Sequence, residues 1–139
     1  EYTADARCFV FTSAEGRRLI YVGQLDTNTS RAQGVGIMVW DSGEIYQGFF
    51  HEDERYGAGR DIYPGGDCYE GKYARGMRNG RGVYVFTNGE AYEGDWKDDR
   101  IEGFGRYEYL NGDSYEGEWR NGMKHGKGKY VHANGEAYD

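Results

Sequence analysis

Proline and cysteine are scarce in this chain, and long apolar runs are missing from it. Of the 139 residues, one is proline and two are cysteine, Cys8 and Cys68. Two cysteines with this spacing match no metal-binding or disulfide framework, so they indicate a reducing compartment. No apolar run reaches the roughly 20 residues that a membrane-spanning helix needs. No signal peptide is visible, although the abrupt start at Glu1 is consistent with a fragment.

Large aliphatic residues are also too few for an ordinary closed core. The apolar fraction is 37%, while glycine occurs 24 times and tyrosine 14 times. A repeat array tolerates this composition, because each unit needs to bury itself only against its neighbours. The net charge of −7 argues against a general affinity for nucleic acid or acidic membranes.

What the chain does contain is a repeat of 23 residues. Three units follow one another without a gap, at 69–91, 92–114 and 115–137, and the first reads YEGKYARGMRNGRGVYVFTNGEA. Each unit opens with Tyr-Glu-Gly, has an aromatic residue at position 5, Gly-x-Gly at positions 12 to 14 and Asn-Gly at positions 20 and 21. Fixed-period similarity of this kind decides the architecture before local propensity does.

Two less regular units and a cap precede these three. Units 21–45 and 46–68 keep the pattern, and the first is two residues longer within Asp26 to Gln33, which we expect to be a loop. Residues 1–20 are predicted to be a degenerate half-repeat. Tyr138 begins a sixth unit, so we expect that the natural chain continues or that order ends there.

Alternation with period two, at positions 1, 3 and 5 and at positions 12 to 18, predicts two strands per unit. Glycine at this density opposes helix. Asn-Gly favours a type I′ two-residue hairpin turn, so the strand before it should pair with the opening strand of the next unit, while a looser loop at positions 6 to 11 joins the strands within a unit. The predicted fold is all-β, an elongated single-layer antiparallel meander of about ten to eleven strands.

The two faces of this meander differ in chemistry. One carries the tyrosine, tryptophan and glycine positions, where rings can lie against backbone. The other pairs acidic positions 2 and 4 with basic positions 13 and 15, as exposed ion pairs of about 0 to 1 kcal/mol each. The acidic residues are Glu70, Glu93, Asp95, Glu116 and Glu118, and the basic ones are Arg60, Arg81, Arg106, Lys127 and Lys129.

The repeat resembles the MORN repeat (membrane occupation and recognition nexus), strongly in units three to five and more weakly in units one and two. The resemblance implies a twisted strip of β-hairpins with an aromatic groove, and roles in scaffolding, dimerisation, binding of partner peptides and phospholipid binding. It also implies that any catalytic domain is separate. Four residues depart from the pattern and are either weak points or specific contacts: Leu25, Met38, Asp61 and His132.

No catalytic or cofactor site is indicated. His51, His125 and His132 lack metal-ligand neighbours at useful spacing, and the carboxylates converge on no nucleophile. The Gly-x-Gly pairs precede strands, whereas a phosphate loop precedes a helix N-terminus. We therefore expect a non-enzymatic protein without a cofactor or metal.

Three surfaces are candidates for binding. Rings in a concave strip suit a helix or extended peptide, or else they form an internal ladder: Tyr46, Tyr69, Tyr73, Trp96 and Trp119. An apolar patch occupies positions that are charged in later units, and it either contacts another subunit or is covered by Phe9 and Phe11: Val35, Ile37, Val39 and Phe49. Basic residues near the loops either bind a lipid headgroup or are solvated charges: Arg75, Arg78, Arg81, Lys124 and Lys127.

These observations favour a scaffold or adaptor module that binds another protein, with a homodimer as one form of contact. The resemblance makes a cytoplasmic setting, in a cytoskeletal or ciliary assembly, the expected one. A phosphoinositide-binding module is the first alternative. A regulatory or targeting segment of an enzyme whose catalytic domain lies outside this sequence is the second.

Overall fold

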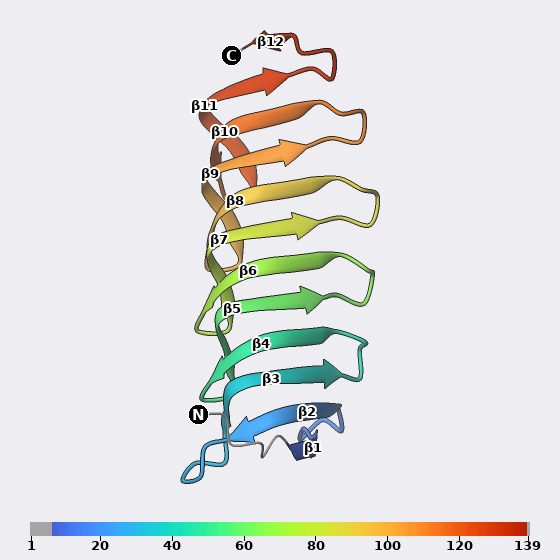
Figure 1. The fold of residues 1–139 in the computed structure, drawn as a ribbon, viewed down its shortest axis with the longest axis vertical. Coiled ribbons are helices and arrows are strands. Elements are labelled where there is room, and N and C mark those ends of the chain that lie inside the picture. The colour runs from blue at the N-terminus through green and yellow to red at the C-terminus, as the bar shows by residue number, and fades with distance from the viewer. Residues whose placement is uncertain (1–6, 139) are drawn as a thin grey trace.

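Twelve strands form one antiparallel sheet in the order of the chain. The computed structural model describes residues 7–138, and the strand order in them runs from β1 to β12 without a crossover (Figure 1). The predicted single-sheet meander is therefore confirmed, with no helix in the described residues. The five units supply ten of the twelve strands. The other two are β1, from the half-repeat, and β12, from the start of the sixth unit.

Each unit contributes an opening strand of seven or eight residues and a closing strand of nine. The strands are β1 (Arg7–Thr12), β2 (Arg18–Leu25), β3 (Ala32–Trp40), β4 (Ile45–His51), β5 (Glu54–Ile62), β6 (Cys68–Ala74), β7 (Met77–Val85), β8 (Ala91–Lys97), β9 (Arg100–Glu108), β10 (Ser114–Arg120), β11 (Met123–Val131) and β12 (Ala137–Tyr138). At about 4.8 Å between strands, one unit advances the array by roughly 10 Å.

The tight turns lie at a different place from the one predicted. The two-residue turns join the strands within a unit, and both of their residues have positive φ, as a type I′ turn requires. They are Glu52-Asp53, Arg75-Gly76, Asp98-Asp99 and Asn121-Gly122. The assignment of this turn to the Asn-Gly near the end of each unit was therefore wrong, as was the looser loop at positions 6 to 11.

The Asn-Gly pair instead belongs to a wider loop between units. In the loop after β7, Gly89 alone has positive φ, at 96°, and its N–H donates to the carbonyl of Phe86 at 3.0 Å. Phe86 N–H in turn donates to the carbonyl of Glu90 at 2.9 Å, which gives a three-residue hairpin loop closed by a glycine bulge. Asn88 accepts the Glu90 N–H through its side chain at 2.9 Å, so this asparagine acts as a local acceptor.

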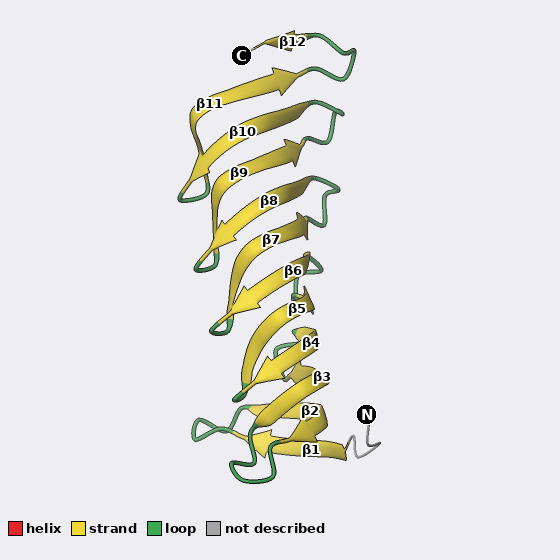
Figure 2. Ribbon diagram, turned by 60° about the vertical axis from the view of Figure 1, so that its left-hand side comes forward, coloured by secondary structure: helices red, strands yellow, loops and turns green. Residues whose placement is uncertain are grey.

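A bulge bends the closing strand of each unit. Gly94 pairs with Gly105, and Trp96 pairs with Ile101. Between these two pairs β8 advances by two residues and β9 by four, so β9 has two extra residues. Gly103 lies within the extra length with φ at 111°, a conformation that favours glycine. Figure 2 shows the result, a single layer whose closing strands curve, and we call the concave side of this curve the inner face.

Acidic residues at position 4 of the unit accept a hydrogen bond from a backbone N–H of this bulge. Asp95 accepts the backbone N–H of Phe104 at 3.0 Å, and Glu118 accepts that of Lys127 at 3.1 Å. Of the predicted exposed ion pairs, Arg60 with Glu70 at 3.0 Å and Arg81 with Asp95 at 3.4 Å form on the same face, while Arg106 pairs with Glu108 of its own strand. The carboxylates at position 4 therefore do more than keep the outer face soluble, because they hold an N–H that the strand ladder leaves free.

The tyrosine at position 1 fills the inner side of each bend. Tyr92 is fully buried, and its ring lies against the cross-strand pair Gly94 and Gly105. A Cβ on Gly105 would overlap the ring and hydroxyl of Tyr92, so only glycine fits. The Tyr92 hydroxyl donates to the carbonyl of Asp95 at 2.9 Å, which satisfies the buried phenol.

Both edges of the array are held by contacts between successive units. On the turn edge, Asp99 N–H donates to the carbonyl of Arg78 at 3.0 Å. On the loop edge, the Asp67 carboxylate accepts Thr87 N–H at 3.0 Å. Since each unit is fixed at both edges, the inner face is presented as a continuous surface rather than as separate hairpins.

Candidate functional site

The five rings proposed for a partner groove form the internal ladder of the array. Tyr46, Tyr69, Tyr73, Trp96 and Trp119 are each at most 7% exposed. They meet edge to face, as in the pair Tyr69 and Trp96 with ring centroids 5.2 Å apart and planes at 81°. Such pairs are worth about 0.5 to 1.5 kcal/mol each beyond burial. Rings enclosed in this way hold the units together and offer little surface to a partner.

A second row of rings lies beside the ladder and is half-exposed. These rings occupy positions 16 and 18 of the unit, and neighbours in the row have centroids between 4.7 and 6.0 Å apart. The row is Tyr63, Tyr84, Phe86, Tyr107, Tyr109 and Tyr130. It runs from unit two to unit five, and Tyr138 of the sixth unit stacks on its last ring, Tyr130, with centroids 5.5 Å apart.

Carboxylates of the loop edge fix this row. The Tyr84 hydroxyl donates to Asp67 at 2.8 Å, and the Tyr130 hydroxyl donates to Asp113 at 2.8 Å. Burial and the carboxylate acceptor Glu90 raise the pKa of Tyr107 to about 12, so this phenol stays a donor at neutral pH. The position 16 rings of units three to five are thus each anchored at the hydroxyl end by a carboxylate.

A cation covers the position 1 tyrosine in three of the five units. Arg55 lies 5.3 Å from the ring centre of Tyr46, and Lys124 lies 4.8 Å from that of Tyr115. Arg78 is 5.8 Å from Tyr69 and 4.6 Å from Trp96. All three occupy position 10 of their unit. Cation–π contacts of this kind are worth roughly 0.5 to 2 kcal/mol.

Unit two replaces the position 16 tyrosine by a buried acid. Asp61 is 1% exposed and forms an ion pair with Arg55 at 3.0 Å. Arg55 also binds Glu44 at 2.6 Å, and the Tyr73 hydroxyl donates to Asp61 at 2.5 Å. A carboxylate–arginine–carboxylate cluster therefore stands where later units have a tyrosine bound to a carboxylate.

The cluster shifts the ionisation of its members. Burial, followed by the neighbouring carboxyl of Asp61, raises the pKa of Glu44 above its ordinary value. Burial raises the pKa of Tyr73 strongly, and Asp61 beside it raises that pKa further. Tyr73 therefore remains a hydrogen-bond donor to Asp61. Asp61 was singled out in the sequence as a departure, but its partners could not be named from the repeat alone.

The apolar patch of Val35, Ile37, Val39 and Phe49 lies on the outer face and is at least partly exposed. The alternative, that Phe9 and Phe11 cover it, is wrong. Phe9 pairs with Tyr21 across β1 and β2 and stacks on its ring, which places it on the inner face. Phe11 lies two residues further along β1 and therefore shares that face.

Other exposed apolar side chains of the first five strands extend this patch. Val22 pairs with Ile37, and Ile45 pairs with both Val39 and Ile62. Val22, Ile37, Ile45 and Ile62 are all between 36% and 42% exposed. Exposed aliphatic side chains therefore gather on the outer face of the first two units, whereas the ion pairs of that face, Arg60 with Glu70 and Arg81 with Asp95, begin at the end of unit two.

The five basic residues considered for a lipid headgroup do not share one surface. Arg78 and Lys124 are folded over rings of the inner face. Arg75 forms an ion pair with Asp98 beside the turn of unit three, at 3.7 Å.

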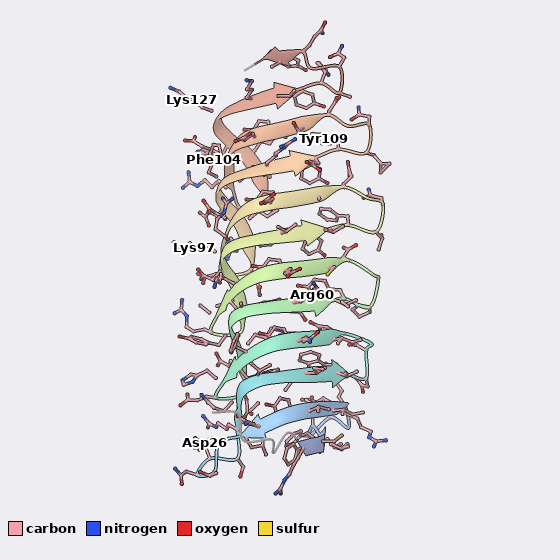
Figure 3. All side chains as sticks on the ribbon, in the orientation of Figure 1. Asp26, Arg60, Lys97, Phe104, Tyr109 and Lys127 are labelled. Atoms are coloured by element: carbon pink, nitrogen blue, oxygen red, sulfur yellow. The ribbon has the colours of Figure 1, made fainter. Side chains whose placement is uncertain are left out.

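The other two lie away from the ring row. Arg81 forms an ion pair on the outer face with the position 4 carboxylate of Asp95, at 3.4 Å. Lys127 occupies position 13 of unit five, as Arg81 does in unit three, and lies on the side of the array opposite Tyr109 (Figure 3). Residues that point in different directions cannot all reach one flat surface.

Residues 7–138 contain neither a candidate metal site nor a helix that could span a membrane. In this part of the chain, no three His, Cys, Asp or Glu side chains are grouped so that they could hold a metal ion. The same residues include no helix with the length and apolar character needed to cross a bilayer.

The MORN repeat family model matches residues 69–91, 92–114 and 115–137, the three units with the most regular ladder. The chain is a MORN-repeat protein. No curated protein matches this MORN-repeat chain. One solved structure that is similar to it is the SAS-4 TCP domain of Drosophila melanogaster, in complex with a proline-rich motif of Ana2. That match has a TM-score of 0.45 and 14% sequence identity, and it covers 99% of this chain and 86% of the other.

Proposed function

We infer that this MORN-repeat protein is a non-enzymatic scaffold or adaptor module that binds a segment of a protein partner along its inner face. The observation that carries this proposal is the continuous row of half-exposed rings from Tyr63 to Tyr130. A single-layer sheet has no second layer to cover such a row. Ordered aromatic rings with fixed orientation are the groups that dominate recognition at protein interfaces.

The spacing of the row suits a regular peptide. One unit advances by about 10 Å, which matches seven residues of an α-helix or three residues of an extended strand. A helix or an extended segment laid along the array would therefore place equivalent side chains on successive units. Both geometries are known modes of peptide recognition.

A protein partner is favoured over a membrane surface. The basic residues that a headgroup would need are divided between the inner face, the outer face and the turn edge, and Arg75 and Arg81 already form ion pairs. The net charge of −7 also opposes binding to an anionic bilayer. Cytoplasmic cytoskeletal or ciliary assembly is the setting we propose, and the MORN resemblance supports it.

Cross-linking capture on the whole chain tests the proposal. Phe86→Ser with Tyr109→Ser removes two half-exposed rings that are not part of the ladder. Phe104→Ser removes a ring that is 50% exposed and lies outside the row, so it is the matched control. We expect capture of a protein partner by the wild type and by the control. The groove variant should lose most of the capture while its circular dichroism is unchanged.

Equal capture by the groove variant would contradict the proposal. Salt-sensitive flotation with phosphoinositide vesicles, combined with no protein capture, would favour the phospholipid alternative. Cross-links from this segment to a catalytic domain in the same polypeptide would favour the regulatory alternative.

A further inference from the structure

We propose that an open pocket between units three and four binds a bulky apolar side chain of the partner, next to an acidic residue of the same partner. This inference rests on the proposed function, because it assumes that a protein segment lies on the inner face. It adds the chemistry of that segment and the unit to which it is anchored.

The pocket has an apolar wall and a polar rim. Its volume is about 320 Å³, which is enough for one large side chain. The half-exposed side chains of Tyr84, Phe86 and Ile101 supply the apolar surface, together with the small exposed part of Trp96. The rim consists of Arg78, Asp99, Arg100, Asn121 and Gly122.

One residue explains why the pocket opens in unit four. Ile101 occupies position 10, where units two, three and five place Arg55, Arg78 and Lys124 over the rings. The isoleucine is shorter than these residues and brings no charge. The equivalent site one unit earlier is lined by two position 10 arginines, Arg55 and Arg78. Here Arg78 is the one position 10 cation in the lining, 5.7 Å from the ring centre of Tyr84 and 4.6 Å from that of Trp96, and Ile101 adds no second one.

The same site one unit earlier supports this explanation. The residues 23 positions back form a pocket of only about 120 Å³, and they include Arg55, Asp61, Tyr63, Tyr73 and Arg78. There the wall is polar, and the Arg55–Asp61 ion pair spans it. If all units were identical, these two pockets would be equal. Instead, this chain has a polar pocket and an apolar one about 10 Å apart.

The charges at the rim indicate an acidic neighbour. The turn of unit four carries two acids, and both are engaged by arginines of unit three: Asp98 with Arg75 at 3.7 Å and Asp99 with Arg78 at 3.1 Å. Arg100 donates to the neutral amide oxygen of Asn121 at 3.3 Å and forms no ion pair within residues 7–138.

Arg100 is exposed, so it keeps a charge that a partner carboxylate can meet. A basic partner residue would instead face both Arg100 and Arg78 at the rim. An apolar residue with an adjacent aspartate or glutamate is therefore the complementary occupant.

A small probe tests the pocket without a known partner. The probe is 3-phenylpropionate, which carries a phenyl ring two carbons from a carboxylate, titrated into the whole isotope-labelled chain. The reporters are the Trp96 indole N–H and the Ile101 methyl groups. We expect saturable shifts at both reporters with millimolar affinity, as is usual for a ligand of this size.

Two further ligands separate the contributions of ring and charge. Acetate has the charge without the ring, and 2-phenylethylamine has the ring with the opposite charge. We expect acetate to produce no saturable shift and the amine to bind at least about threefold more weakly than the acid. Equal binding of the acid and the amine would overturn the assignment of an acidic neighbour.

Variants locate the binding. Ile101→Arg restores the type of side chain that unit three has at this position, so the fold tolerates it, and it should weaken the probe at least about tenfold. Arg100→Glu should weaken the acid and strengthen the amine. Arg106→Glu makes the same charge change at a residue outside the pocket lining, and it should have no effect.

Two results would reject the pocket. One is the absence of saturable shifts at Trp96 and Ile101, and the other is binding that Ile101→Arg leaves unchanged. Either result leaves the groove proposal standing if Phe86→Ser with Tyr109→Ser still abolishes partner capture. Conversely, a pocket that binds the probe in a protein that captures no partner would reject both the groove and the partner side chain proposed as its occupant.

Discussion

Position 16 of the unit is a tyrosine in units three to five and an aspartate in unit two, and the two regions pack this point differently. In the later units, a phenol donates to a carboxylate of the preceding loop, as Tyr84 does to Asp67. In unit two, Arg55 joins Asp61 to Glu44. The first arrangement has one hydrogen bond from a neutral phenol to a carboxylate, whereas the second places an arginine between two carboxyl groups.

The outer face differs between the same regions. Units one and two expose aliphatic side chains such as Ile37, while units three to five expose ion pairs such as Arg81 with Asp95. The position 1 tyrosine of the inner ladder is nevertheless the same throughout, with Tyr46 and Tyr92 both fully buried. The repeat therefore conserves the glycine and ring positions that close each bend, and it allows the surfaces on either side to change.

The largest expected effect comes from breaking the cluster. Arg55→Met leaves Asp61 buried without its counter-ion, which should cost about 3 to 5 kcal/mol of unfolding free energy. Lys124→Met changes the same position in unit five, where the side chain is exposed, and should cost under about 1 kcal/mol. Urea unfolding of both variants measures the difference, and equal losses would contradict the contrast between the two regions.

Next in size is the loss of a single hydroxyl. Tyr73→Phe removes a donor to the buried Asp61, so about 1.5 to 3 kcal/mol should be lost. Tyr130→Phe removes the donor to Asp113, a carboxylate that also accepts the Ala133 N–H, and it should cost about 1 kcal/mol. Hydrogen exchange in β5 and β11 shows whether each loss stays in its own unit.

A smaller change is expected when unit two is converted to the pattern of the later units. Arg55→Ile, Asp61→Tyr and Tyr73→Trp together give the residues that unit four and its neighbours have at these positions. Replacing a buried ion cluster with packed rings is often neutral or stabilising, so we expect a gain of about 0 to 2 kcal/mol. A loss above about 2 kcal/mol would show that the polar cluster is the better packing for this end of the array.

The smallest effect concerns pH and has opposite signs in the two regions. Hydrogen bonds from Tyr130 and from the Ala133 N–H hold the pKa of Asp113 below 3.8, so its stabilising contribution is complete above pH 3.8 and is lost as pH falls through the folded value. The pKa of Glu44 lies above 4.5, so the folded state takes up its proton first and gains stability as pH falls through that higher value.

Carbon-detected titration of the side-chain carboxyls measures both midpoints. Asp113 should titrate below 3.8 and Glu44 above 4.5. Asp61→Asn removes the neighbouring carboxyl and should bring the Glu44 midpoint down, while Asp113 is unchanged. An unchanged Glu44 midpoint would mean that burial alone raises its pKa.

The strand order could be predicted from the sequence because period-two alternation and a gapless repeat leave few topologies. The turns could not, since Asn88-Gly89 was taken as the tight turn while the structure uses Arg75-Gly76 and Asp98-Asp99. The Asp98-Asp99 pair is held in positive φ by contacts with the preceding unit, such as Asp99 N–H to the Arg78 carbonyl. Tertiary contacts of this kind leave no signature in a single turn sequence.

The sequence predicted correctly which positions lie on the inner face, but it did not predict which of their rings are buried. Alternation places Tyr92 and Tyr107 on one face without showing which ring is enclosed. The bulge at Gly103 decides this, because it folds β9 around Tyr92 and leaves Tyr107 half-exposed at the rim. The pocket beside Ile101 was missed for a related reason. It is marked by an isoleucine at position 10, where units two, three and five have a cation, and only the structure shows that those cations stack on rings.

The strands lie across the long axis of the array, so the hydrogen bonds between them run along it (Figure 1). A pull applied between the two ends would load these bonds in an unzipping direction, where few resist at once, and the sheet would open from an edge. Each unit of 23 residues that peels away releases roughly 75 Å of extended chain. Within a tethered assembly, this module would lengthen in steps under low tension and would refold one unit at a time when the load is removed.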